Sequence, residues 1–128
     1  MTLDPSETHV LLGADGSATA VPGGEAFWSQ PEPSLDLIGR DWLVSEFVCD
    51  ADWQNWEMHP NGDELVYLLS GSAVLVLDTE QGLVRAPLEG RAAVLVPRGI
   101  WHTAEVRAPS RMLFVTMGAG TQHRPRNA

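Results

Sequence analysis

The sequence predicts an all-β protein, a barrel or jelly roll built from about nine to eleven short strands. Clusters of Gly, Pro, Asn, Asp and Ser recur at short, regular spacing along the chain, as they do where turns join short strands. The segments between them either alternate between apolar and polar residues or are apolar throughout, and none has a helical period. A chain of 128 residues, 44% of them hydrophobic, fits one domain over residues 1–128.

The N-terminal part predicts two strands and a loop. Residues 1–7 contain Pro and acidic residues and are expected to be a flexible end. Strands over 8–12 and 18–21 are separated by a Gly-rich turn. Pro and Gly then interrupt the pattern, so the next segment is expected to be a loop, in which Phe27 and Trp28 cap an open end of the barrel or pack on a partner.

The middle of the chain predicts a strand over 41–50 and a second over 51–59. The apolar runs 65–69 and 73–77 are separated by Ser70–Ser72, which is expected to be a tight hairpin turn. Both runs are apolar on both faces, so each face needs a cover. In a barrel one face is interior, and a homodimer is the simplest cover for the other.

The C-terminal part predicts four more strands, over 83–88, 92–96, 101–106 and 112–117. The strand 92–96 is also apolar on both faces. The last residues, 121–128, are basic and interrupted by Pro, so we expect a second flexible end.

The side chains suited to binding a metal are placed by two of the predicted turns. Glu57 and His59 are two residues apart and therefore point to the same face of a strand. The turn Pro60–Asp63 is expected to fold Glu64 back towards His59, and the turn after Pro97 leads into a strand that carries His102. A set of carboxylates and imidazoles suits a divalent first-row metal ion.

These residues resemble the two motifs of a small single-domain cupin. The first motif of that family is His-x-His, three or four residues, Glu, six residues and Gly. The stretch 57–71 matches this spacing, with Glu57 in the place of the first His. The second is Pro-x-Gly-x-x-His, which Pro97, Gly99 and His102 match within 90–102. The resemblance implies a double-stranded β-barrel of the jelly-roll type and a metal site formed by Glu57, His59, Glu64 and His102.

The role of Glu57 stays open at this stage. If all four residues bind, two carboxylates cancel the charge of a divalent ion and make it a weaker Lewis acid. If His59, Glu64 and His102 form a two-His, one-carboxylate set, Glu57 is free to act as a catalytic general base. In a third alternative no metal binds and the polar cluster is a hydrogen-bonded core. The resident metal, whether Fe, Mn, Zn or Ni, is not resolved by the sequence.

The resemblance and the composition narrow the classes of function. With a formal net charge of −9 and Arg as its only basic residue type, the chain is not expected to bind nucleic acid. It has neither a long apolar run nor a signal-peptide pattern, so we expect no membrane partner and a cytoplasmic location.

We expect a metal-binding protein that acts on a small organic molecule, as an Fe(II) or Mn(II) dioxygenase or as a redox-neutral isomerase, lyase or cyclase. The alternatives are a non-catalytic module that binds a small ligand or a metal, and an interaction role for the apolar sheet face.

Overall fold

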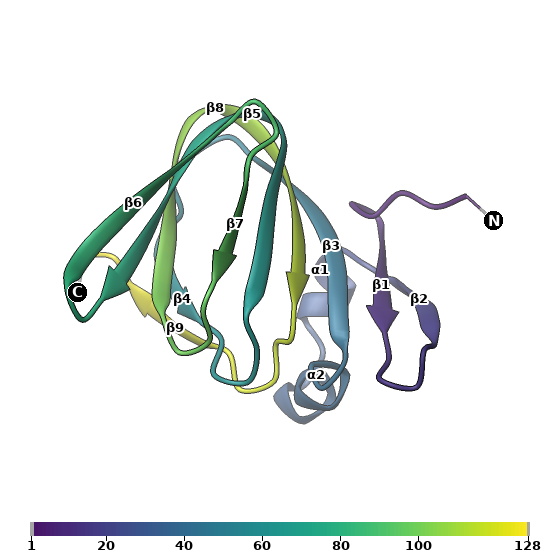
Figure 1. The fold of residues 1–128 in the computed structure, drawn as a ribbon. Helices are drawn as coiled ribbons and strands as arrows, with labels where there is room; N and C mark the ends of the chain where they lie inside the picture. The colour runs from purple at the N-terminus through teal and green to yellow at the C-terminus, as the bar shows by residue number, and fades with distance from the viewer. Residues whose placement is uncertain (1, 128) are drawn as a thin grey trace.

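The computed structural model describes residues 2–127, and it confirms the predicted all-β fold (Figure 1). Two long antiparallel strands, β5 and β8, pair with each other, and every other described strand joins them directly or through a neighbour. The strands within the described residues are β1 (Thr8–Leu12), β2 (Ala18–Pro22), β3 (Trp42–Cys49), β4 (Asn55–Met58), β5 (Glu64–Thr79), β6 (Gly82–Glu89), β7 (Ala93–Val96), β8 (Trp101–Thr116) and β9 (Gln122–Pro125).

The predicted hairpin at Ser70–Ser72 is wrong, because β5 runs through it without interruption. The segment instead contains shifts of register against β8. Gly71 has φ of 102°, and a side-chain carbon there would come within 2.5 Å of the carbonyl oxygen of Pro109 on β8. A close crossing of two backbones therefore needs this glycine, and the result is a bend within one strand instead of a turn between two.

Two short helices replace the predicted loop between the second and third strands. Helix α1 spans Glu25–Trp28 and α2 spans Glu32–Ile38, and both lie beside β3 at one end of the barrel (Figure 1). Helix α2 begins with Glu32 and Pro33, and both residue types favour the first turn of a helix. Among residues 2–127 no helix has the length and apolar character needed to cross a membrane.

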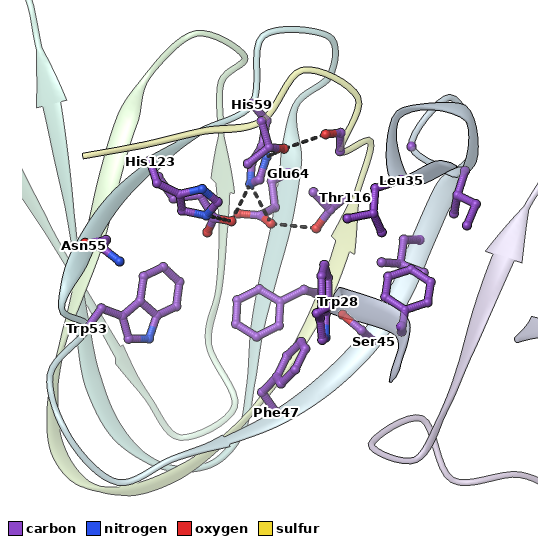
Figure 2. A pocket seen from close by; sticks show the side chains of 18 of the residues that line it. Trp28, Leu35, Ser45, Phe47, Trp53, Asn55, His59, Glu64, Thr116 and His123 are labelled. Carbon is purple, nitrogen blue, oxygen red and sulfur yellow. Dashed lines mark hydrogen bonds and ion pairs between the residues drawn. The ribbon is translucent and has the colours of Figure 1, made fainter. Parts of the chain in front are cut away.

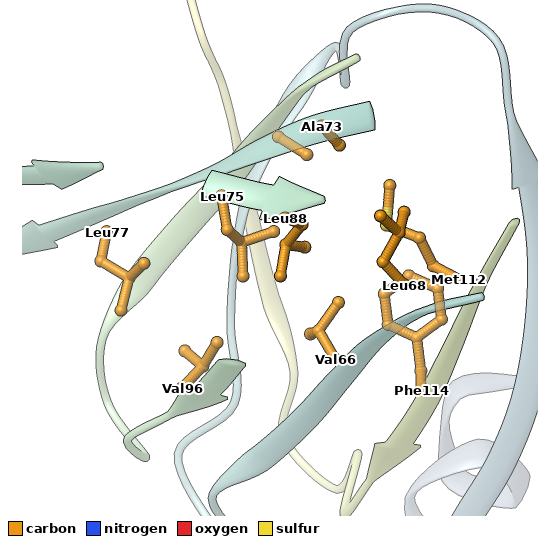
Figure 3. Close-up of a cluster of buried hydrophobic side chains, with 10 residues drawn as sticks. Val66, Leu68, Ala73, Leu75, Leu77, Leu88, Val96, Met112 and Phe114 are labelled. Carbon is orange, nitrogen blue, oxygen red and sulfur yellow. The ribbon is translucent and has the colours of Figure 1, made fainter. Parts of the chain in front are cut away.

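The hydrophobic core is formed by side chains of β5, β6, β7 and β8 (Figure 3). Its buried members are Val66, Leu68, Ala73, Leu75, Leu77, Leu88, Val96, Ala104, Met112 and Phe114. The residues of β5 from Ala73 to Leu77 are all buried within the single chain, so both faces of this part are covered without a partner subunit. On β7, in contrast, Leu95 is 73% exposed. The homodimer therefore stays a prediction, with the β7 face as its remaining basis.

Both ends of the described chain contact the barrel. The expected flexible end 121–128 instead contributes β9, which pairs antiparallel with β4. Near the other end, the carbonyl oxygen of Pro5 accepts a hydrogen bond from the backbone N–H of Glu46 on β3, at 3.2 Å.

Candidate metal centre

The structure brings the four predicted site residues together inside the barrel. Glu57 lies on β4, His59 follows that strand, Glu64 begins β5 and His102 lies near the start of β8. The Nε2 atom of His59 is 3.3 Å from Oε2 of Glu64, and the Nε2 atom of His102 is 3.1 Å from Oε1 of the same residue. Strands β4 and β5 do not pair, however, so the two halves of the first motif meet across the interior and not within a hairpin.

Backbone hydrogen bonds tie the two turn segments of the site to each other. The N–H of Gly99, in the second motif, donates to the carbonyl oxygen of His59 at 2.9 Å. The N–H of Arg98 donates to the carboxylate of Asp63 at 2.9 Å. Residues that are distant in sequence thereby hold His59 and His102 in a fixed relation.

The partners of the two buried imidazoles fix which ring nitrogen carries the proton. The hydroxyl of Thr121 donates to the carbonyl oxygen of Gly118 at 2.6 Å, so it accepts from Nδ1 of His59 at 2.8 Å. Nδ1 of His102 is 3.0 Å from the carbonyl oxygen of Ile100, which can only accept. In the neutral form each ring therefore presents the lone pair of Nε2 to the site.

The carboxylate of Glu64 is held in a similar way. The hydroxyl of Thr116 donates to Oε2 at 2.6 Å, while Oε1 is buried and has no hydrogen-bond partner. The Nε2 atoms of His59 and His102 are also buried without a partner. Acceptor atoms facing one another at this distance need a cation between them, either protons or a metal ion.

The pKa values describe how protons take that place when no metal is bound. Burial raises the pKa of Glu64, but hydrogen bonds and attraction to His102 and His59 have the larger effect and lower the pKa to about 2. Burial lowers the pKa of His102, yet its pKa is raised overall because Glu64 stabilises the imidazolium.

The spacing of these atoms fits the ligand set of a metal ion. Ligand atoms at about 2.1 Å from a common ion lie roughly 3.0 to 3.4 Å apart in tetrahedral or octahedral arrangements. The two distances from Glu64 to the imidazoles lie in this range, one from each of its carboxylate oxygens. The oxygens of Glu57 lie farther out, 3.8 Å from Nε2 of His59 and 3.9 Å from Nε2 of His102. One ligand atom from each of Glu57, His59 and His102 lies within 4.8 Å of the others, so Glu57 also borders the centre.

A further imidazole, His123, comes from the C-terminal segment that the sequence analysis treated as a flexible end. It lies opposite Glu57 in the pairing of β4 with β9, and its Nε2 atom is 3.5 Å from Oε1 of Glu57. The hydrogen bond to Glu57 raises the pKa of His123. Thr116 and Thr121 were missed as well. The short strand β9 is polar on both faces, and therefore carries no alternation that predicts a strand.

A cavity of about 960 Å³ leads from this centre towards the two helices (Figure 2). Its walls come from α1, α2, β3 and β8, with Trp53 from the segment before β4. Figure 2 shows His59, Glu64 and His123 on one side of the space, with Trp28, Phe47 and Trp53 on the other. Phe27 and Trp28 line the cavity, in agreement with the predicted capping role.

His9 lies outside the centre. It is fully buried, and its Nδ1 atom donates to the carbonyl oxygen of Pro5 at 3.0 Å. Its ring packs edge-on against Phe27, with 5.3 Å between the ring centres. It therefore supports the aromatic side of the cavity from behind.

No family model matches the chain, and no curated protein matches it. Solved structures do. A cupin superfamily protein of Desulfitobacterium hafniense is 23% identical over 60% of this chain and 67% of its own, with a TM-score of 0.50. Peruvianin-I, a cysteine peptidase from Thevetia peruviana latex, is 15% identical over 66% of this chain and 56% of its own, with a TM-score of 0.55.

Oxalate decarboxylase of Bacillus subtilis, a protein with Mn(II) centres, matches at 17% identity and a TM-score of 0.56 over 67% of this chain. The match spans only 24% of the decarboxylase, and little more than half of peruvianin-I. At these identities the likeness concerns the fold, and the differing activities of these proteins agree with the rule that one fold serves many functions.

Proposed function

Because this chain has the cupin fold, we propose that it binds a divalent metal ion through His59, His102 and Glu64 and acts with it on a small organic molecule. The reaction is a redox-neutral proton transfer, of the isomerase or lyase type. Glu57 is the general base.

The observation that carries the proposal is the convergence of two buried imidazoles and one buried carboxylate on the same space. Nε2 of His59 faces Oε2 of Glu64 and Nε2 of His102 faces Oε1, and each of the three side chains is held by a further hydrogen bond. Such second contacts orient metal ligands in proteins.

The position of Glu57 supports its role as a base. Its side chain is 27% exposed and lines the cavity, whereas Glu64 is 3% exposed. A metal ion held by His59, His102 and Glu64 would supply Lewis acidity to a substrate oxygen and so make a proton on the neighbouring carbon or hydroxyl more acidic. Glu57 takes that proton and returns it to a second position on the substrate. His123, which is half exposed, stabilises the Glu57 carboxylate from the solvent side.

The cavity does not support thiol chemistry of a peptidase type. Cys49 also lines it, but burial raises the pKa of its thiol. A nucleophilic cysteine needs a lowered pKa, which makes the thiolate available at neutral pH.

Elemental analysis tests the metal site first. Protein purified without added metal or chelator should hold a divalent ion, and His59→Ala and His102→Ala should lose it. His9→Ala is the matched control, because His9 is as completely buried as His102 and lies outside the centre. Equal metal content in all three variants would eliminate the site.

Deuterium incorporation tests the reaction. Ketones and enols incubated with the metal-loaded protein in D₂O are followed by NMR. We expect exchange at carbon with the wild type, and none with Glu57→Gln at unchanged metal content. Loss of the metal in Glu57→Gln would make Glu57 a ligand. Oxygen uptake by the Fe(II)-loaded protein would instead favour a dioxygenase, and ligand binding without turnover a binding module.

A further inference from the structure

The cavity has a nearly continuous wall of aromatic rings that leads from helix α1 to the metal centre. Neighbouring rings along it lie 4.7 to 6.3 Å apart between centres. In order along the wall they belong to Phe27, Trp28, Phe47, Phe114 and Trp53, and Trp53 in turn packs against His102. Rings at this spacing offer edges and faces for a further ring to pack on.

The charged groups that line the same cavity are mostly acidic, and the imidazole of His123 is paired with Glu57. Besides Glu57 and Glu64, three carboxylates line it, those of Glu32, Asp36 and Asp52. No Arg within residues 2–127 lines the cavity, and the chain has no Lys. The carboxylates outnumber the charges of a divalent ion, so the cavity keeps a negative potential even when the centre is loaded.

From these two features we infer that the cavity takes a ring-bearing molecule without negative charge, with a hydroxyl or carbonyl oxygen directed to the His59–Glu64 end. The ring packs along Trp28 and Phe47. Carboxylates such as oxalate are disfavoured because five carboxylates line the cavity and the imidazole of His123 is already paired with Glu57. The direction of the oxygen rests on the proposed metal centre, whereas the ring site and the charge preference do not.

Calorimetric titration with a matched set of probes tests this inference. The probes are 2-naphthol, 2-naphthoate and 2-naphthylmethylamine, which share a ring system and differ in charge. Protein treated with EDTA and protein loaded with Zn²⁺ are both titrated. We expect both forms to bind 2-naphthol at least about fivefold more tightly than 2-naphthoate, and to bind 2-naphthylmethylamine at least as tightly as 2-naphthol. Equal or tighter binding of 2-naphthoate, weaker binding of the amine than of 2-naphthol, or no binding of 2-naphthol would overturn the inference.

Side-chain variants locate the ring site. Trp28→Ala should weaken 2-naphthol binding about tenfold, because it removes one face of the wall. Leu37→Ala is the control, since Leu37 is an exposed apolar residue on the adjacent helix α2 that does not line the cavity. Equal effects of the two substitutions would overturn the ring site.

A charge reversal tests the role of the acidic lining residues Glu32, Asp36 and Asp52, here called the acidic rim. The substituted residue lies outside helix α1, so the result does not depend on whether α1 folds correctly. Glu32→Arg should raise the affinity for 2-naphthoate about fivefold. Glu80→Arg makes the same charge change at an exposed position outside the cavity and should have no effect. Equal effects of the two reversals would overturn the role of the rim.

The two proposals fail in different ways. If the protein holds no metal but binds 2-naphthol in a manner that depends on Trp28, the ring site stands and the metal centre does not. If the histidine variants lose metal while the wild type binds no 2-naphthol, the metal centre stands and the ring site is overturned.

Discussion

Replacement of Thr121 by Val tests whether the site is prepared for a metal by the contacts behind its ligands. The substitution keeps the shape of the side chain and removes the hydroxyl that accepts from Nδ1 of His59 at 2.8 Å and donates to Gly118 at 2.6 Å. The ring then loses the contact that keeps the proton on Nδ1. A proton on Nε2 would occupy the position that a metal ion needs.

The expected effect is larger on metal binding than on the fold. Loss of a contact of this kind lowers metal affinity by about 10- to 100-fold, which corresponds to about 1.4 to 2.7 kcal/mol. The buried N–H of His59 left without a partner should also lower the free energy of unfolding of the metal-free protein, by about 1 to 3 kcal/mol.

Competition with a chromophoric chelator measures the metal affinity, and urea denaturation in EDTA measures the stability. Thr121→Ser is the matched control, because it keeps the hydroxyl and should bind the metal as the wild type does. If Thr121→Val is folded and binds the metal with wild-type affinity, the contact has no role in orienting His59 and the reasoning is refuted.

Three further outcomes are expected. In EDTA, the free energy of unfolding should fall by on the order of 3 kcal/mol as the pH drops from 4.5 towards 2. The reason is that folding lowers the pKa of Glu64 to about 2, so the unfolded state binds the proton first. If urea denaturation of Glu64→Gln shows the same dependence of this free energy on pH as the wild type, the prediction is contradicted. Gly71→Ala should lower the free energy of unfolding by about 3 kcal/mol or more, and Gly82→Ala by only about 1 kcal/mol. Both glycines have φ above 100°, but only Gly71 faces the backbone of β8. Equal losses of stability in thermal denaturation would argue against this close backbone contact. Sedimentation should show a dimer that Leu95→Arg converts to a monomer, since Leu95 is exposed on β7, and a wild-type monomer would end the homodimer prediction.

Local pattern was sufficient for the class of fold and for four of the site residues. Glu57 and His59 share a face because strand side chains alternate, and turn residues precede Glu64 and His102. These are rules about neighbours in the chain, so they can be applied without coordinates. They also predicted that Phe27 and Trp28 cap the barrel or pack on a partner, although the two short helices in this segment were missed.

The rules failed where a contact between distant segments decides the outcome. Ser70–Ser72 has the composition of a turn, but pairing with β8 on both sides of Gly71 keeps β5 continuous. The dimer argument lost its basis over 73–77 for the same reason, because packing within the chain covers both faces of that part of β5.

The sequence alone therefore determined which side chains are able to hold a metal, and the tertiary structure decided what surrounds them. Pairing of β9 with β4 places His123 beside Glu57, and packing behind the site brings Thr121 to His59 and Thr116 to Glu64. Each of these pairs joins residues that are more than 50 positions apart. No local period of hydrophobicity records such a pair, because it depends on how the sheets close around the core and not on the order of neighbouring residues.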